Sequence, residues 1–157
     1  MPDMLVKLYE LPDHTELITS LQQEGVLIRP AFSFEKWIVS KWITEQFSAS
    51  WAAEAERGFA HTPISTLVAL QDNLLLGCAS YDCTARGYFG PTGVREDQRG
   101  RGIGKALLYA TLKAMWDVGY GYAVIGGAGP TDFYTKFSGA AIIEGSSPGI
   151  YRNLLKG

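Results

Sequence analysis

The sequence predicts a mixed α/β fold in which hairpins and helical crossovers build one sheet, and not a doubly wound parallel sheet. Two apolar runs, residues 64–70 and 74–81, flank the turn signal Gln-Asp-Asn at residues 71–73 and predict a hairpin. A long helix is predicted over residues 102–118, where apolar residues recur at helical spacing and Gly119 ends the pattern. The expected order β-α-α-β-β-β-α-β-α-β-β combines both kinds of connection, which indicates a mixed sheet.

The remaining elements follow from shorter patterns. The other expected strands are residues 4–11, 88–94, 122–125, 140–144 and 149–153, and the other expected helices are residues 15–24, a tract that Ser33 caps, and residues 132–137. Ser48-Ala49-Ser50 divides the tract that begins at Ser33 into two helices. Pro91 removes a ladder donor from the strand at residues 88–94, so we expect an irregularity there. The chain contains no repeat or long linker, and we expect one domain over residues 1–157.

Composition excludes several classes of protein. The 157 residues are 46% hydrophobic and 19% charged, which suffices for one buried core. A net charge of −2 gives no overall positive field to hold nucleic acid. Cys78 and Cys83 form no CxxC pair and no His/Cys cluster surrounds them, so we expect reduced thiols and no metal. The first eleven residues lack a leader pattern and no apolar stretch is long enough to span a membrane, so we expect a cytoplasmic protein with no membrane partner.

The most informative segment is Arg-Gly-Arg-Gly-Ile-Gly at residues 99–104, which opens directly into the long helix. Glycine adopts positive φ and lets the backbone approach a ligand closely. The first turn of a helix leaves about four N–H groups unpaired, and with the helix dipole these suit a phosphate group. Arg99, Arg101 and Lys105 add positive charge at the rim. The segment therefore predicts a site for a small anionic ligand.

Two nucleotide-binding motifs do not fit this segment. A dinucleotide fingerprint needs a third glycine at position 105 and a place in the first βαβ unit, and both are missing. A phosphate-binding Walker A loop needs Ser or Thr after Lys105, where the chain has Ala106. A tight strand-to-helix turn without a ligand, and a nucleotide-binding protein of another fold, remain open alternatives.

Two motifs resemble a known family. Arg99-x-x-Gly102-x-Gly104 resembles the Q/R-x-x-G-x-G/A signature of the GNAT superfamily of acyl-CoA-dependent N-acetyltransferases. Downstream, the segment Phe-Tyr-Thr-Lys-Phe-Ser-Gly-Ala at residues 133–140 resembles the family's F/L-Y-x-K-x-G-F/A segment, with one extra residue before the glycine. The resemblance implies a central, mostly antiparallel sheet with helices on both faces. This sheet would splay open between the strand that ends at Val94 and the strand at residues 122–125, with acetyl-CoA in the gap.

The resemblance also implies roles for particular residues. The pantetheine amides would pair with the backbone of Thr92, Gly93 and Val94. The pyrophosphate would bind the loop and first helical turn, formed by Arg99, Gly100, Arg101, Gly102, Ile103, Gly104 and Lys105. A primary amine would attack acetyl-CoA directly in a ternary complex, and Tyr134 would protonate the leaving sulfur. A phenol has an ordinary pKa of about 10 and is protonated at neutral pH; a packing role for Tyr134 is the alternative.

Some positions depart from the family pattern. The strand at residues 88–94 carries no carboxylate to act as general base, and the nearest titratable residues in the sequence are Asp82, Glu96 and His61. A water chain is another route for the proton. Gly127 stands where many relatives have an asparagine that contacts CoA. These departures leave a second hypothesis, a non-catalytic acyl-CoA-binding regulatory module.

The acceptor and its pocket are less defined by the sequence. The region that shapes the acceptor pocket in such enzymes contains four large aromatics within fifteen residues: Trp37, Trp42, Phe47 and Trp51. They predict either core packing, or an apolar acceptor wall or dimer face. The acceptor is expected to be a small-molecule or peptide amine, and a homodimer is compatible with the sequence.

Overall fold

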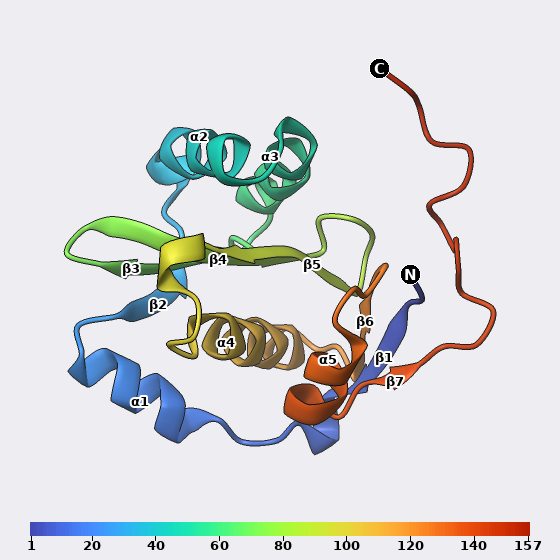
Figure 1. Cartoon of the computed structure of the whole chain (residues 1–157), viewed down its shortest axis with the longest axis horizontal. Helices are drawn as coiled ribbons and strands as arrows, with labels where there is room; N and C mark the ends of the chain where they lie inside the picture. Colours follow the sequence, from blue (N-terminus) through green and yellow to red (C-terminus); the bar gives the residue numbers. More distant parts are fainter.

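A seven-stranded sheet organises the chain, which the computed structural model describes from Met1 to Gly157 (Figure 1). The strands are β1 Met4–Lys7, β2 Leu27–Pro30, β3 Thr66–Gln71, β4 Leu74–Tyr81, β5 Tyr88–Val94, β6 Tyr122–Ile125 and β7 Ala141–Ile142. Their order in the sheet is β2-β3-β4-β5-β6-β1-β7. All neighbours are antiparallel except β5 and β6, so the sheet is mixed, as predicted.

The central strands confirm the local sequence signals. β3 and β4 form the predicted hairpin around residues 71–73, where Asp72 and Asn73 both have positive φ. The predicted irregularity of β5 is also present, because the register between β4 and β5 shifts between Ala79 and Tyr81. Gly90 and Pro91 lie opposite this shift, and Gly90 has a φ of 120°.

Five helices connect the strands. They are α1 Thr15–Gln23, α2 Lys36–Gln46, α3 Ala49–Glu56, α4 Ile103–Asp117 and α5 Thr131–Ser138. Ser48 divides α2 from α3 as predicted, and its hydroxyl accepts a hydrogen bond from the backbone N–H of Trp51 at 3.1 Å. Ser33 is not the cap expected for α2, because it begins a short 3₁₀ turn. At that turn the Glu35 carboxylate accepts the backbone N–H of Phe32 at 2.7 Å.

The helices cover both faces of the sheet and create two apolar layers (Figure 1). On one face α4 lies across β3, β4 and β5, and its buried residues Leu107, Leu112 and Met115 belong to the larger core. On the other face α2 and α3 pack through Val39, Ile43 and a few smaller side chains against the opposite sides of β3 and β4. Burial of these apolar stripes is the main stabilising contribution to such a layered fold.

The ends of the chain differ from the predictions. Residues 149–153 do not form a strand, and the expected strand at residues 140–144 is reduced to β7, which has two residues. The reason is that β1 pairs with β6, with Met4 opposite Ile125. The edge of β6 that faces away from β5 is therefore already paired with the first strand of the chain. β7 then pairs with the free edge of β1.

Two further boundaries differ from the expected ones. β1 ends at Lys7, and the chain then forms a 3₁₀ turn over Leu8–Glu10. We expected the strand to reach residue 11. The edge strand β2 was not expected at all, since its four residues, Leu-Ile-Arg-Pro, show no clear alternation and end in a proline. No helix in the structure combines the length and the apolar character needed to cross a lipid bilayer.

The sheet splays open between β5 and β6. These two parallel strands pair only at their start, where Tyr88 lies opposite Val124 and Phe89 opposite Ile125. Beyond this point β5 continues to Val94 with hydrogen bonds to β4 alone, so its other edge is free from Gly90 onward. The splay expected between the strand ending at Val94 and β6 is therefore present.

Candidate functional site

The splay between β5 and β6 contains a cavity of about 820 Å³, which we call the cleft. Its walls are β5 at residues 89–94, the loop and first turn of α4 at residues 98–105 without Arg101, and the β6–α5 connection at residues 125–130. Aromatic side chains of α3 and α5 complete the lining. A cavity of this size and largely apolar lining is typical of a small-molecule site.

The start of α4 presents unpaired backbone donors to this cleft. Gly100 and Gly102 have φ values of 85° and 84°, a left-handed conformation that favours glycine, and Gly102 is the N-cap residue of α4. The first N–H of this turn with a backbone acceptor is that of Ala106, which donates to the Gly102 carbonyl. The N–H groups of residues 100–105 have no acceptor in the protein. Together with the helix dipole they create a site suited to an anion.

The predicted basic side chains separate into two groups. Arg99 and Lys105 line the cleft, and Lys105 Nζ lies 4.1 Å from the centroid of the Phe137 ring, an arrangement that orients the amine along the cleft wall. The side chain of Arg101 does not line the cleft. Its guanidinium donates to Gln98 at 2.7 Å and to Gln71 at 3.0 Å and lies 3.5 Å from Glu24, because the turn directs it toward α1 and β3.

Tyr134 lies on α5 at the wall of the cleft. Its side chain is 7% exposed, and its ring packs edge-on against Phe89 of β5, with centroids 6.3 Å apart, and against Phe133. Burial raises the pKa of the Tyr134 phenol, and no charged group contributes to the shift. The hydroxyl makes no hydrogen bond within the protein, so it is a protonated donor free to meet a ligand atom.

The four aromatics between residues 37 and 51 occupy different environments. Phe47 and Trp51 line the cleft and stack on each other with centroids 5.1 Å apart. Trp42 packs edge-on against Phe47 but belongs to the core between α2, α3 and the sheet, outside the cleft. Trp37 is 69% exposed on the outer side of α2. Trp42 therefore has the packing role, whereas Phe47 and Trp51 line the cleft, and their expected part in an acceptor wall stays a prediction.

None of the titratable residues considered as a base lines the cleft. Asp82 accepts hydrogen bonds from the Tyr120 hydroxyl at 2.8 and 2.9 Å and from the Gly87 N–H at 2.6 Å, a structural role in the turn before β5. His61 Nδ1 lies 2.8 Å from the Ser65 hydroxyl. Glu96 is exposed in the 3₁₀ turn Glu96–Gln98.

The β6–α5 connection contributes more to the cleft than the sequence indicated. All residues from Ile125 to Pro130 line it, including Gly127, for which the resemblance implied an asparagine. The Gly127 N–H donates to the buried Asp3 carboxylate at 2.8 Å. The run of glycines in this segment was a signal of close backbone approach, but nothing in the sequence indicated which partner approaches it.

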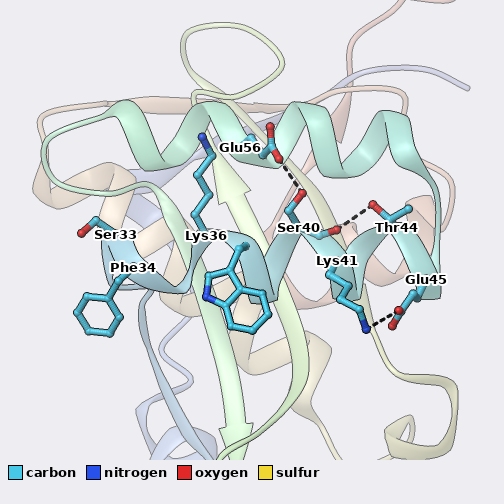
Figure 2. A pocket seen from close by; sticks show the side chains of 9 residues that line it. Ser33, Phe34, Lys36, Ser40, Lys41, Thr44, Glu45 and Glu56 are labelled. Atoms are coloured by element: carbon cyan, nitrogen blue, oxygen red, sulfur yellow. Dashed lines mark hydrogen bonds and ion pairs between the residues drawn. The ribbon is translucent and has the colours of Figure 1, made fainter.

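A second hollow of about 680 Å³ lies on the outer side of α2 and shares no residue with the cleft (Figure 2). Several of its polar groups are paired with each other: Ser40 donates to Glu56 at 2.7 Å, and Lys41 lies 2.7 Å from Glu45. Trp37 and Phe34 are its apolar residues. Lys36 also lines this hollow and has no hydrogen-bond or ion-pair partner within the protein.

No group of three or more His, Cys, Asp and Glu side chains in the structure is arranged to hold a metal ion. Cys78 and Cys83 are free and buried, and burial raises the pKa of the Cys78 thiol to about 12. Neither cysteine lines the cleft. The chemistry available in the cleft therefore consists of backbone amides, two basic side chains, one phenol and an aromatic wall.

Comparison with known proteins relates this arrangement to one family. Residues 32–139 match the acetyltransferase (GNAT) family. This match contains α2 to α5, the whole first motif and the second motif up to Gly139. No curated protein matches the chain.

Solved structures share the fold at low sequence identity. One is the GCN5-related glucosamine N-acetyltransferase region of a fungal multi-domain GH3 β-N-acetylglucosaminidase, with a TM-score of 0.74 and 14% identity, covering 90% of this chain and 19% of that one. Another is a GCN5-related N-acetyltransferase from Sphaerobacter thermophilus, with a TM-score of 0.65 and 19% identity, covering 90% of this chain and 48% of that one. The present chain thus spans half or less of these two proteins.

A third similar structure contains a ligand. It is a GNAT family acetyltransferase from Brucella melitensis in complex with acetyl-CoA, with a TM-score of 0.51 and 19% identity, covering 75% of this chain and 86% of that one. At these identities the likeness establishes a common fold.

Proposed function

The chain belongs to the acetyltransferase (GNAT) family, and on this premise we propose that it transfers an acetyl group from acetyl-CoA to a primary amine in a ternary complex. One observation carries the proposal: the turn with unpaired N–H groups at residues 100–105 lines, at residues 100 and 102–105, the same cleft as Tyr134 with its free phenol. The complex of the Brucella melitensis acetyltransferase with acetyl-CoA supports the choice of acyl donor. We also propose that residues 1–157 act as a single domain.

The residues of the cleft fit the two polar parts of acetyl-CoA. The amides of residues 100–105 would bind the pyrophosphate, and Arg99 and Lys105 would add charge-assisted contacts. The free edge of β5 at Thr92, Gly93 and Val94 would pair with the pantetheine amides as an added strand does. The apolar surface of the cleft would cover the rest of the arm.

The chemistry asked of the protein is modest. Acetyl-CoA supplies an activated thioester. The neutral amine of the acceptor attacks the thioester carbonyl carbon, so that a C–N bond forms and the C–S bond breaks. Tyr134 would donate its proton to the leaving sulfur, since its raised pKa keeps the phenol protonated. The proton released by the amine returns through water to the phenolate, which restores the acid.

Three measurements test the proposal. Calorimetric titration with acetyl-CoA, CoA, NAD and ATP should give saturable binding for the two CoA compounds alone. A saturating ligand at a hundred times its Kd also stabilises the fold by about 2.7 kcal/mol, which thermal unfolding detects. Release of the CoA thiol in the presence of an amine panel then measures transfer. Binding of NAD or ATP without CoA would contradict the proposal.

The structure also favours one alternative, a non-catalytic acyl-CoA-binding regulatory module. The observation behind it is that Asp82, Glu96 and His61 all lie outside the cleft, so no general base faces the thioester site. Tyr134→Phe distinguishes the two functions. An enzyme should lose about a hundredfold in kcat and keep its affinity for acetyl-CoA. A regulatory module should bind acetyl-CoA and release no CoA with any amine, before or after the substitution.

A further inference from the structure

The cleft passes through the splay from one face of the sheet to the other. Its lining includes Leu108 of α4 on one face and Trp51 of α3 on the opposite face (Figure 1). β5 separates the two sides because side chains alternate along a strand. Val94 packs against the core beneath α4, whereas Gly93 pairs with Cys78, which belongs to the core beneath α2 and α3. We therefore distinguish an α4 side and an α3 side of the cleft.

The groups that suit the acyl donor belong to the α4 side. They are the unpaired amides at the start of α4, the basic side chains of Arg99 and Lys105, and the phenol of Tyr134, whose ring lies in the core beneath α4. A donor held by these groups would fill the α4 side of the cleft and bring its thioester to the splay. The amine would then reach the thioester carbon from the α3 side.

Two stacked aromatic rings form the wall of the cleft on the α3 side. Phe47 lies against Gly93 and packs edge-on against Trp42, with ring centroids 5.8 Å apart. It also stacks on Trp51, with centroids 5.1 Å apart, so the Phe47 ring is enclosed. Trp51 remains 38% exposed. The surface that α3 presents to the cleft is therefore the indole of Trp51, and the ring behind it holds this indole in place before any ligand binds.

The α3 side of the cleft carries no charge. No carboxylate lines the cleft, and its charged side chains are those of Arg99 and Lys105 on the α4 side. The two carboxylates of α3, Glu54 and Glu56, lie outside the lining and accept hydrogen bonds from side-chain hydroxyl groups. A second cationic nitrogen on the acceptor would find no opposite charge in the cleft, and the two basic groups would repel it. An acceptor whose body is uncharged therefore fits this side.

We propose that Trp51, backed by Phe47, forms the acceptor wall, and that the preferred acceptor is a primary amine attached to an uncharged aromatic body. This inference rests on the proposed acetyl transfer. Stacking on the indole and burial of a ring against it both favour an aromatic body over a short aliphatic chain. The apolar surroundings also assist the reaction, because desolvation disfavours the charged ammonium and the attacking nitrogen must be neutral.

Three acceptors with the same carbon chain test this wall: 4-phenyl-1-aminobutane, 1-aminobutane and 1,4-diaminobutane. The ring of the first is too far from the nitrogen to change its basicity much. With the full chain and saturating acetyl-CoA, kcat/KM for the phenyl compound should exceed that for 1-aminobutane by about tenfold, the effect expected of one stacked and buried ring. The diamine should gain nothing over 1-aminobutane beyond the statistical factor of its two equivalent amines, because its second charge has no partner in the cleft.

Variants of Trp51 show whether the indole is responsible. Trp51→Leu should reduce the preference for the phenyl compound toward one, through a higher KM for that amine. Trp51→Phe, which keeps a ring at this position, should retain most of the preference. Trp37→Leu is the matched control, because Trp37 is 69% exposed in the outer hollow and lies outside the cleft. This control should keep the full preference, and the Kd of acetyl-CoA should be the same in all three variants.

Four outcomes decide against the proposal. Equal kcat/KM for the phenyl compound and 1-aminobutane, or a preference that survives Trp51→Leu, overturns the acceptor wall and leaves acetyl transfer standing. A raised Kd of acetyl-CoA in Trp51→Leu, with the KM of the amine unchanged, assigns the indole to the donor and also overturns it. A diamine that is the best of the three acceptors contradicts the uncharged body. Failure to bind acetyl-CoA, or to acetylate any amine, overturns the proposed function and the wall together.

Discussion

The ring of Phe47 lies directly against Gly93 of β5, so closely that a Cβ at this position would overlap the ring. Gly93 therefore allows the helical layer to approach the free edge of β5. Since Phe47 also stacks on Trp51 and both line the cleft, this contact connects the packing of α2 and α3 with the width of the cleft.

Gly93→Ala should destabilise the protein by about 1–3 kcal/mol, because the added methyl group overpacks the site. The same substitution should cost clearly less in a Phe47→Ala background, where the ring is gone. Urea unfolding of the four proteins in this double-mutant cycle measures the coupling. Equal costs in the two backgrounds would show that the ring does not constrain Gly93.

Lys105 and Arg101 should differ in their effect on acetyl-CoA binding. Lys105→Met keeps an apolar stem against Phe137 and removes the charge, and should raise the Kd of acetyl-CoA about tenfold. Arg101→Met, the matched control, should leave the Kd close to its original value, since the guanidinium contacts Gln98, Gln71 and Glu24 outside the cleft.

Calorimetry at low and high salt separates the electrostatic contribution of Lys105, which should shrink at high ionic strength. The prediction is refuted if both variants lose the same affinity.

The raised pKa of Tyr134 predicts the alkaline behaviour of kcat. Burial favours the neutral phenol and raises the pKa of Tyr134 above its ordinary value, so the acid should remain available through the whole neutral and mildly alkaline range. We expect kcat measured with a saturating amine to show no decline that depends on Tyr134 below pH 9. A descending limb below pH 9 that disappears in Tyr134→Phe would contradict the assignment.

Tyr120 and Asp82 should contribute to stability in a pH-dependent way. The pKa of Tyr120 is raised from 10.0 to about 12 by burial and by its hydrogen bond to Asp82. The folded state then holds this proton more tightly than the unfolded state, so the contribution is complete below pH 10 and is lost as pH rises toward 12. Tyr120→Phe should cost about 2 kcal/mol at neutral pH.

Above pH 10 the stability of Tyr120→Phe should fall less steeply than that of the unmodified protein. Urea unfolding at several pH values measures both curves, and parallel curves between pH 10 and 12 would exclude the proposed linkage. Tyr151, whose pKa is also raised to about 12, titrates in both proteins and does not affect their difference.

The elements that the sequence predicted well are those set by neighbouring residues. The long helix at residues 102–118 has its own periodicity and stop signal, and it differs from α4 by one residue at each end. The hairpin around residues 71–73 is likewise specified by its turn. The loop at residues 99–104 could be assigned to an anion site because glycines before a helix have a defined backbone chemistry.

The features that escaped prediction depend on residues distant in sequence. Arg101 lies in the middle of the predicted site in the sequence, yet its side chain contacts Gln71 of β3 and Glu24 at the end of α1. Tyr151 approaches Gly126 only in the folded chain, and Tyr151 belongs to no motif. Periodicity and turn signals contain no information on such pairings.

The position of β1 between β6 and β7 has a consequence for how the protein folds. Met4 pairs with Ile125, which lies 121 residues further along the chain. Until these distant segments meet, the apolar residues of β1 have no strand to pair with, and joining them requires closure of a very long loop. Such non-local pairing slows folding, so the half of the sheet that holds β5, β4 and β3 should assemble first and the half with β6, β1 and β7 last.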